Sequence, residues 1–193
     1  MDFRMSIRSI AILLGISALI LNGCGQASVR PDGEDGVSLH RYETEMRRIM
    51  GKGDAIVKKL NAEFDGYFLA YGLVVPPKEM AAARAALKKV GKTWRKGMGD
   101  LAAIYAEFAK LHPPSDLKEV HASVMRTTDL YMTELSKIVT FMEKGDAAGF
   151  AQAELDALAQ YHKWSAETDV MIRNAGYDPA TANSERRFVR LRK

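Results

Sequence analysis

The sequence predicts an all-α protein, namely an antiparallel up-down-up-down four-helix bundle. Apolar residues recur at spacings of three and four over residues 39–174, which is the period of one face of an α-helix. Alanine is frequent and runs of β-branched residues are scarce, so helix is favoured over strand. Short connections with proline or glycine separate four long segments, and such connections place consecutive helices antiparallel.

The first helix is expected over residues 39–72, with Ser38 as a candidate N-cap. Its apolar stripe comprises Leu39, Tyr42, Met46, Ile49, Ile56, Leu60, Phe64, Tyr67 and Tyr71. Gly51 and Gly53 allow a kink or a break within it. Two prolines at positions 76–77 end the segment, because a residue before proline is disfavoured in the helical region.

The second and third helices are expected over residues 77–111 and 115–144. The second contains three glycines that lower its helix propensity, so packing must hold it. The third has Ser115 as its expected N-cap, Gly145 just past its end, and a 4-3 alternation typical of a bundle seam. The stripes of these two helices include Leu87, Trp94, Ile104, Phe108, His121, Tyr131, Leu135 and Met142.

The fourth helix is expected over residues 147–174, with Phe150, Leu158, Tyr161, Thr168 and Ile172 in its stripe. Residues 177–179 are expected to start a loop, and Ser184 is a candidate cap for a final short helical turn. The bundle domain is therefore expected over residues 39–174, followed by a basic tail over residues 175–193. Its core is expected to include Leu60, Leu87, Trp94, Tyr131 and Leu135.

The first 24 residues carry the pattern of an export signal. Arg4 and Arg8 precede an apolar run at residues 10–21, which is too short to span a bilayer core of about 30 Å. The run ends in Leu-Asn-Gly-Cys at residues 21–24, which resembles the lipobox of bacterial lipoproteins. An ordinary cleaved signal or a retained membrane anchor are the alternatives.

The resemblance to bacterial lipoproteins implies cleavage after Gly23 and lipid attachment to Cys24. The signal peptide would then occupy residues 1–23, and the polar residues 24–38 would form a flexible tether. Two or more acyl chains make membrane anchoring stable. Position 25 is glycine and not the aspartate of the enterobacterial retention signal, so the outer membrane is favoured if the cell has two membranes.

The composition limits the chemistry of the mature chain. The chain has 193 residues, a single cysteine and a formal charge of +4, which falls to +3 without residues 1–23. With Cys24 lipidated, disulfides, thiolate catalysis and cysteine-bound metals are excluded. The charge is too mild to indicate a nucleic-acid partner. No sequence signature of an enzyme is present, so we expect no enzymatic activity.

Three histidines are expected near one end of the bundle. His40 opens the first helix, His112 follows the second, and His121 lies in the first turns of the third, with Asp169 near that level. Imidazoles with a carboxylate suit zinc or copper. Alternatively, two are exposed at helix ends and His121 is a hydrogen-bonded residue of the seam. We expect no bound metal or other cofactor.

The last two expected helices weakly resemble those of soluble four-helix b-type cytochromes, through residues 142–145 and 161–163 and the prolines at 113–114. In that family a methionine on the first helix and a histidine on the last bind haem iron. The resemblance implies Met50, or Met46, paired with His162. The alternative is that both methionines belong to the core and His162 to its boundary.

The chain ends in a cationic segment with interleaved apolar residues. Its cations are Arg186, Arg187, Arg190, Arg192 and Lys193. Such a segment can lie on an anionic lipid surface, or it can be a loosely ordered solubilising tail. The sequence thus predicts a lipid-anchored extracytoplasmic protein without enzymatic activity, which binds or supports an envelope protein that the sequence does not identify. A haem- or metal-binding bundle is the alternative.

Overall fold

The computed structural model describes residues 38–71 and 75–191, and the regular elements of this part of the chain are all helices. The prediction of an all-α protein is therefore confirmed for these residues. The predictions for residues 1–37, including Gly23 and Cys24, lie outside the described residues, as do Arg192 and Lys193.

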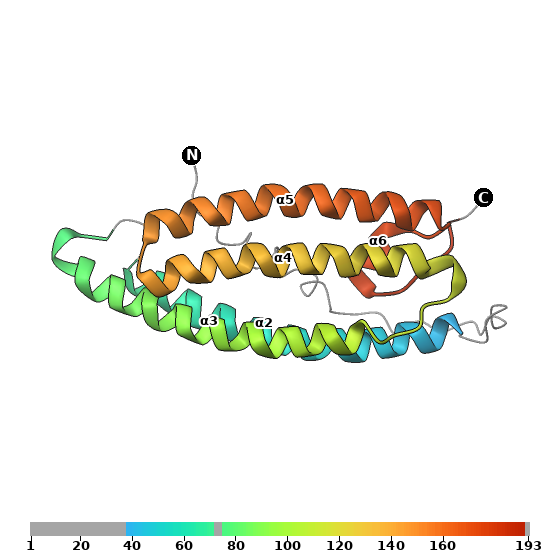
Figure 1. The fold of residues 1–193 in the computed structure, drawn as a ribbon, viewed down its shortest axis with the longest axis horizontal. Helices are drawn as coiled ribbons and strands as arrows, with labels where there is room; N and C mark the ends of the chain where they lie inside the picture. The colour runs from blue at the N-terminus through green and yellow to red at the C-terminus, as the bar shows by residue number, and fades with distance from the viewer. Residues whose placement is uncertain (1–37, 72–74, 192–193) are drawn as a thin grey trace.

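Four long helices dominate the structure: α2 (Leu39–Tyr71), α3 (Met80–Phe108), α4 (Lys118–Lys144) and α5 (Ala147–Asn174). Short elements complete it: the 3₁₀ helices η1 (Pro77–Glu79) and η2 (Ser115–Leu117), and the helix α6 (Pro179–Glu185). In Figure 1 each long helix runs back along the one before it. The helix α2 continues unbroken through Gly51 and Gly53, since its apolar stripe is packed on both sides of them.

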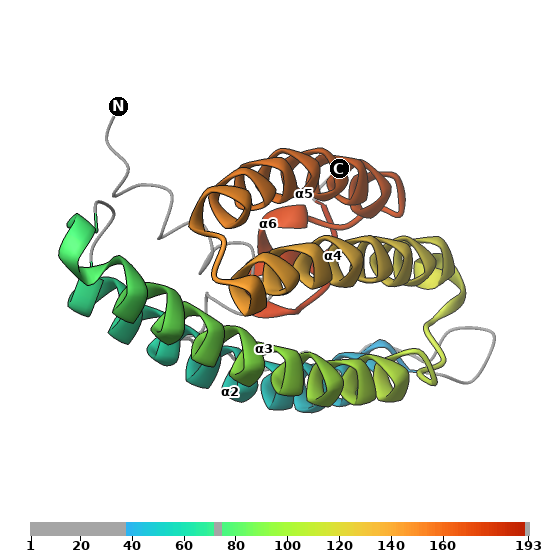
Figure 2. The ribbon, with the colours of Figure 1, turned by 60° about the vertical axis from the view of Figure 1, so that its left-hand side comes forward.

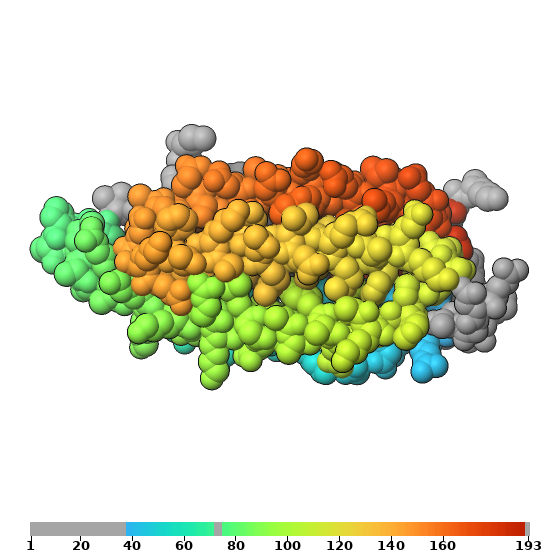
Figure 3. Space-filling model, in the orientation of Figure 1, coloured from blue at the N-terminus to red at the C-terminus, as the bar shows by residue number. Residues whose placement is uncertain are grey.

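The long helices pack in chain order, α2 on α3, α3 on α4 and α4 on α5, with no comparable backbone interface between α2 and α5. Figure 3 shows α3, α4 and α5 side by side on one face of the molecule. Figure 1 shows α6 toward the end where α2 begins and α5 ends, and Figure 2 shows it beside α5. We call this the proximal end, and the end with the α4–α5 turn the distal end. Residues 176–191 form the C-terminal segment.

Two groups of buried apolar residues form the core, one toward each end. The distal cluster includes all five predicted core residues, Leu60, Leu87, Trp94, Tyr131 and Leu135, each no more than 5 % exposed. The proximal cluster contains Tyr42, Met46, Ile49, Met50, Ile104, Phe108, Leu117, Val120, Ile172, Tyr177, Ala182 and Phe188. Its last three residues come from the C-terminal segment and not from the long helices. The predicted core positions are thus confirmed, but the proximal core is larger than predicted.

Two predicted caps are confirmed and two are wrong. The Ser38 hydroxyl accepts the backbone N–H of Arg41 at 3.2 Å, and Gly145 ends α4 in the left-handed region at φ 70°. Ser115 makes no capping hydrogen bond, because the chain enters a 3₁₀ turn there. Ser184 lies in the last turn of α6, where its hydroxyl donates to the carbonyl of Ala180.

Two aspartates that the sequence analysis did not identify as N-caps cap α5 and α6. Asp146 accepts the N–H of Gly149 at the start of α5, and Asp178 accepts the N–H of Ala180 at the start of α6. Pro179 occupies the first turn of α6, where its fixed φ is compatible with helix. The loop expected from residue 177 is therefore short, because Tyr177 and Asp178 lie outside the helices and α6 begins at Pro179.

The helices α3 and α4 approach closely at Gly91. A Cβ atom on Gly91 would lie 2.7 Å from the backbone nitrogen of Glu143, so glycine permits this contact. One turn further along α3, the Arg95 guanidinium donates to Glu143 at 2.9 Å and to the hydroxyls of Ser136 and Thr140. These contacts hold α3 against α4 beside the distal cluster.

Candidate binding cavity

A partly open cavity of about 170 Å³ lies at the proximal end, lined by α2, α3, α4, α5 and the C-terminal segment with its helix α6. Its wall is mostly apolar. The apolar lining residues are Tyr42, Met46, Met50, Phe108, Val120, Val124, Ile172, Ala182 and Phe188. They come from the four long helices and the C-terminal segment, so the cavity forms only in the complete fold.

Polar side chains from α4, α5, α6 and the C-terminal segment form the rest of the wall: Thr127, Tyr161, Ser165, Thr168, Asn183 and Arg186. Thr168 shares a hydrogen bond of 3.3 Å with Ser123, and the Asn183 amide donates to Asp169 at 2.8 Å. Burial raises the pKa of Tyr161, while its hydrogen bond with Ser165 lowers it. Hydroxyls therefore gather on the α4–α5 side of the cavity.

A buried ion pair adjoins the cavity. The Arg186 guanidinium donates to the Asp54 carboxylate at 2.9 Å, and the two side chains are 8 % and 20 % exposed. Burial raises the pKa of Tyr105 to about 12, and the nearby Asp54 carboxylate adds to the rise. Burial also raises the pKa of Tyr131, to which the neighbouring phenols of Tyr105 and Tyr161 contribute. Tyr131 belongs to the distal cluster, and Tyr105 and Tyr161 pack against it.

Beside the apolar wall, Tyr42 and His121 share a hydrogen bond of 3.0 Å between the phenol oxygen and Nδ1. The Phe108 ring stacks on the imidazole with 4.8 Å between ring centroids. Burial lowers the pKa of His121 and raises that of Tyr42, so both side chains favour their neutral forms. This pair joins α2 to α4 without introducing a charge.

The C-terminal segment is packed against the bundle, and the expectation of a loosely ordered tail is therefore corrected. The backbone N–H of Phe188 donates to the buried Glu43 carboxylate at 2.6 Å, and the Phe188 side chain is 9 % exposed. Arg190 pairs with Asp116, which also accepts the Tyr177 hydroxyl at 2.7 Å. Carboxylates of α2 and η2 thus bind the segment.

Three of the segment's predicted cations lie within the described residues and have carboxylate partners. Arg186 is buried in its ion pair, and Arg190 lies over the Tyr177 ring and pairs with Asp116. Arg187 has a longer ion pair of 3.5 Å with Glu185. Of the five predicted cations, these three therefore face carboxylates of the same chain.

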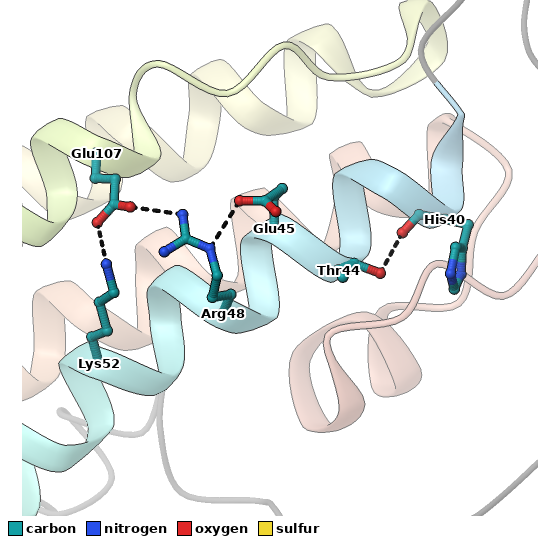
Figure 4. Close-up of polar contacts among 6 residues, drawn as sticks. All are labelled: His40, Thr44, Glu45, Arg48, Lys52 and Glu107. Atoms are coloured by element: carbon teal, nitrogen blue, oxygen red, sulfur yellow. Dashed lines mark hydrogen bonds and ion pairs between the residues drawn. The ribbon is translucent and has the colours of Figure 1, made fainter.

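The three histidines predicted as metal ligands are not brought together. Figure 4 shows His40 at the start of α2, where its backbone carbonyl accepts the Thr44 hydroxyl at 2.8 Å. The side chains of His40 and His112 are exposed, while His121 is buried against Tyr42. Within residues 38–71 and 75–191, no group of three His, Cys, Asp or Glu residues is placed to hold a metal ion.

The same view shows an ion-pair network between α2 and α3. Glu107 on α3 accepts hydrogen bonds from Arg48 at 2.7 Å and from Lys52 at 2.8 Å, and Arg48 also donates to Glu45 (Figure 4). These hydrogen bonds lower the pKa of Glu107 and raise that of Arg48. The side chains are substantially exposed, so the network aligns the two helices and is no candidate site.

The methionine and histidine predicted from the cytochrome resemblance lie in different environments. Met50 is 9 % exposed and lines the cavity, and Met46 lies beside it. His162 is exposed on α5, with its ring against the edge of Tyr161. At about 170 Å³, the cavity is also below the about 300–1,000 Å³ typical of cofactor sites. The pair therefore does not fit a haem in this arrangement.

Sequence reasoning identified part of the wall but not how its polar residues come together. Met46, Phe108 and Ile172 were assigned to helix stripes, whereas Asp54, Ser165 and Arg186 were not connected with one another. The Asp-Pro pair at 178–179 is a local signal that was present, because it typically starts a helix. A short helix there would have indicated that the segment after α5 folds back.

Comparison with known proteins adds no family assignment. No protein-family model, no curated protein and no solved structure matches this chain. In the part of the chain that the structure describes, no helix combines the length and apolar character needed to cross a bilayer.

Proposed function

We propose that this protein is a lipid-anchored, extracytoplasmic component of the cell envelope that binds a small molecule without transforming it. The lipobox-like motif ending at Cys24 supports the anchor. The cavity at the proximal end supports the binding role and is the observation that carries the proposal. Under this proposal the long helices are an up-down-up-down bundle that serves as the scaffold of the site.

The composition of the cavity wall supports a binding site, although its volume suits only a ligand smaller than the usual occupants of protein pockets. Proteins pack their interiors densely, and voids larger than a water molecule are few. This one combines an apolar wall with hydroxyls on one side, the usual arrangement for holding and orienting a small ligand. None of its hydroxyls is part of a nucleophile, base and acid arrangement, so binding is better supported than catalysis.

Binding to another envelope protein has less support. The large apolar side chains that are exposed lie on α2, α3, α4, α5 and the C-terminal segment: Leu69, Met80, Leu130, Leu155, Val170, Val189 and Leu191. Exposed apolar residues that are scattered in this way are normal on protein surfaces. No observation on the described residues favours the haem- or metal-binding alternative over the cavity.

The anchor is tested with a Cys24→Ala variant of the full chain. If Cys24 carries the lipid, the variant leaves the membrane fraction or accumulates as an unprocessed precursor. Intact-mass measurement should find the lipid on the native chain, with Cys24 at its N-terminus. An unmodified mature chain that begins at another residue would contradict this part of the proposal.

The binding role is tested by native mass spectrometry of the full-length chain extracted from the membranes of its own host. We expect a retained small molecule with the native chain. A Val124→Phe variant should lose it, because the larger side chain fills the cavity beside α4. A Leu130→Phe variant, altered at an exposed site on α4, should retain it. A native chain that retains nothing would contradict the binding role.

A further inference from the structure

We infer that the cavity selects a small neutral aromatic molecule that carries one hydroxyl or carbonyl group. This inference rests on the proposed binding role and adds the chemical class of the ligand. Three properties of the cavity determine that class: its volume, the charge balance at Arg186 and the placement of the hydroxyls.

The volume suits a ligand of about one aromatic ring with a small substituent. An apolar protein cavity of about 150 Å³ accommodates benzene, and the present cavity measures about 170 Å³. Met46 and Met50 line one side and Phe108 and Phe188 others. Thioethers adapt their shape and interact favourably with aromatic rings, so this wall favours an aromatic body over an extended chain.

The charge balance favours a neutral ligand. Arg186 is the charged side chain among the described lining residues, and its guanidinium is bound to Asp54 at 2.9 Å. A ligand carboxylate would have to compete with Asp54 or bring a second anion beside it, and both choices require desolvation of a charge. A cationic ligand would face the Arg186 guanidinium across the cavity. A neutral molecule avoids both penalties.

The hydroxyls favour one polar substituent on the ring. Thr127 from α4 and Ser165 from α5 are among the polar lining residues, whereas the methionines of the wall come from α2. A hydroxyl donates one hydrogen bond and accepts two, so Ser165 keeps capacity for a ligand while bonded to Tyr161. A phenol-like hydroxyl or a carbonyl directed at this wall can form a hydrogen bond with one of these hydroxyls. An unsubstituted ring forms no such hydrogen bond.

The test compares three probes, namely phenol, benzene and benzoate, by equilibrium dialysis against the full-length lipidated chain in nanodiscs. Empty nanodiscs correct for partition into lipid. We expect phenol to bind about two- to tenfold more tightly than benzene, the ratio that one net hydrogen bond supplies. Benzoate should bind more weakly than both. Val124→Phe should reduce the binding of phenol and benzene alike.

Two further variants separate hydrogen bonding from a general loss of structure. Thr127→Val combined with Ser165→Ala should bring phenol to the affinity of benzene, while benzene binding stays within about twofold. Thr133→Val removes an exposed hydroxyl from the same helix and should change neither probe. If the double variant no longer binds benzene, the single variant Ser165→Ala is measured in the same way. Its preference for phenol over benzene should still be smaller than that of the native chain.

The outcomes that overturn the inference are distinct from failure of the proposed binding role. Equal affinities for phenol and benzene, or a phenol preference that survives the double variant, would overturn the role of the hydroxyls. Tighter binding of benzoate than of phenol would show that the site prefers a negatively charged ligand. If no probe binds but the native chain retains another compound from its host, the class is wrong and the binding role stands. If neither occurs, both fail.

Discussion

The two ends of this bundle are held together in different ways. At the distal end, apolar faces of the long helices meet each other, with Leu87, Leu135 and Val139 each no more than 3 % exposed. At the proximal end, the C-terminal segment adds Phe188 and the buried Arg186 to the core, and a cavity remains. The distal end has the organisation of a stabilising core, whereas the proximal end combines packing with the polar groups and space that binding requires.

The largest effect is expected from the distal core. Leu135→Ala should lower the free energy of unfolding by an amount in the upper half of the range of about 2–5 kcal/mol, because Leu135 is 3 % exposed within a dense cluster. Urea denaturation followed by circular dichroism measures the change. Leu130→Ala on the same helix is the control, since Leu130 is 46 % exposed and should change stability by about 0.5 kcal/mol or less. Equal effects of the two substitutions would contradict the assignment of the α4 face.

The next effect concerns the buried ion pair of the proximal end. Arg186→Leu should cost about 3 kcal/mol, near the lower limit for breaking a buried pair, because Asp54 remains a fifth exposed. The matched control is Arg187→Leu, the neighbouring residue with a 36 % exposed side chain and a weak pair with Glu185. Urea denaturation measures the free energy of unfolding of both variants. A loss no greater than that of the control would show that the C-terminal segment adds little to the proximal end.

A smaller effect, with opposite signs at two glycines, probes the contact of α3 with α4. Gly91→Ala should destabilise by about 1–3 kcal/mol, because its Cβ would press on the backbone of Glu143. Gly99→Ala on the same helix should stabilise by about 0.5–1 kcal/mol, because no atom lies within 4 Å of its Cβ and alanine favours helix. Thermal unfolding of the two variants distinguishes these outcomes. Stabilisation by Gly91→Ala would mean that α3 and α4 lie further apart.

The smallest effect is a pH dependence restricted to the proximal end. Burial lowers the pKa of His121 below its ordinary value of 6.5, so the unfolded chain binds this proton at higher pH than the folded chain. The stability linked to His121 is therefore fully present above about pH 6.5 and is lost as the pH falls toward the folded pKa.

Urea midpoints at pH 7.5 and pH 5 measure this dependence. His121→Gln should reduce the difference between the two midpoints, whereas His112→Gln at an exposed site should leave it unchanged. Carboxylates such as Glu107, whose pKa is lowered, contribute to the loss at low pH in every variant. The comparison of the two histidine variants therefore isolates the contribution of His121. If the change in midpoint between pH 7.5 and pH 5 were the same in both variants, this would contradict a buried neutral imidazole.

The sequence was most informative where local periodicity determines structure. A stripe with helical spacing identified Leu60, Trp94 and Leu135 as core residues, because neighbouring turns of one helix decide which face is apolar. The partners of Arg186 and of the Phe188 N–H lie 132 and 145 residues earlier, and no local pattern encodes such contacts. The C-terminal segment therefore had the composition of a solvated tail, although four carboxylates from the rest of the chain bind it, namely Glu43, Asp54, Asp116 and Asp169.

The docking of the C-terminal segment on α2 also orders the steps of folding. Loop closure over 145 residues is slow and unfavourable until the contacts that it creates are made. During synthesis from the N-terminus, Tyr42 emerges well before Phe188, whose ring packs against it. An intermediate with a formed distal end and an exposed Tyr42 face is therefore open to aggregation until Phe188 has docked.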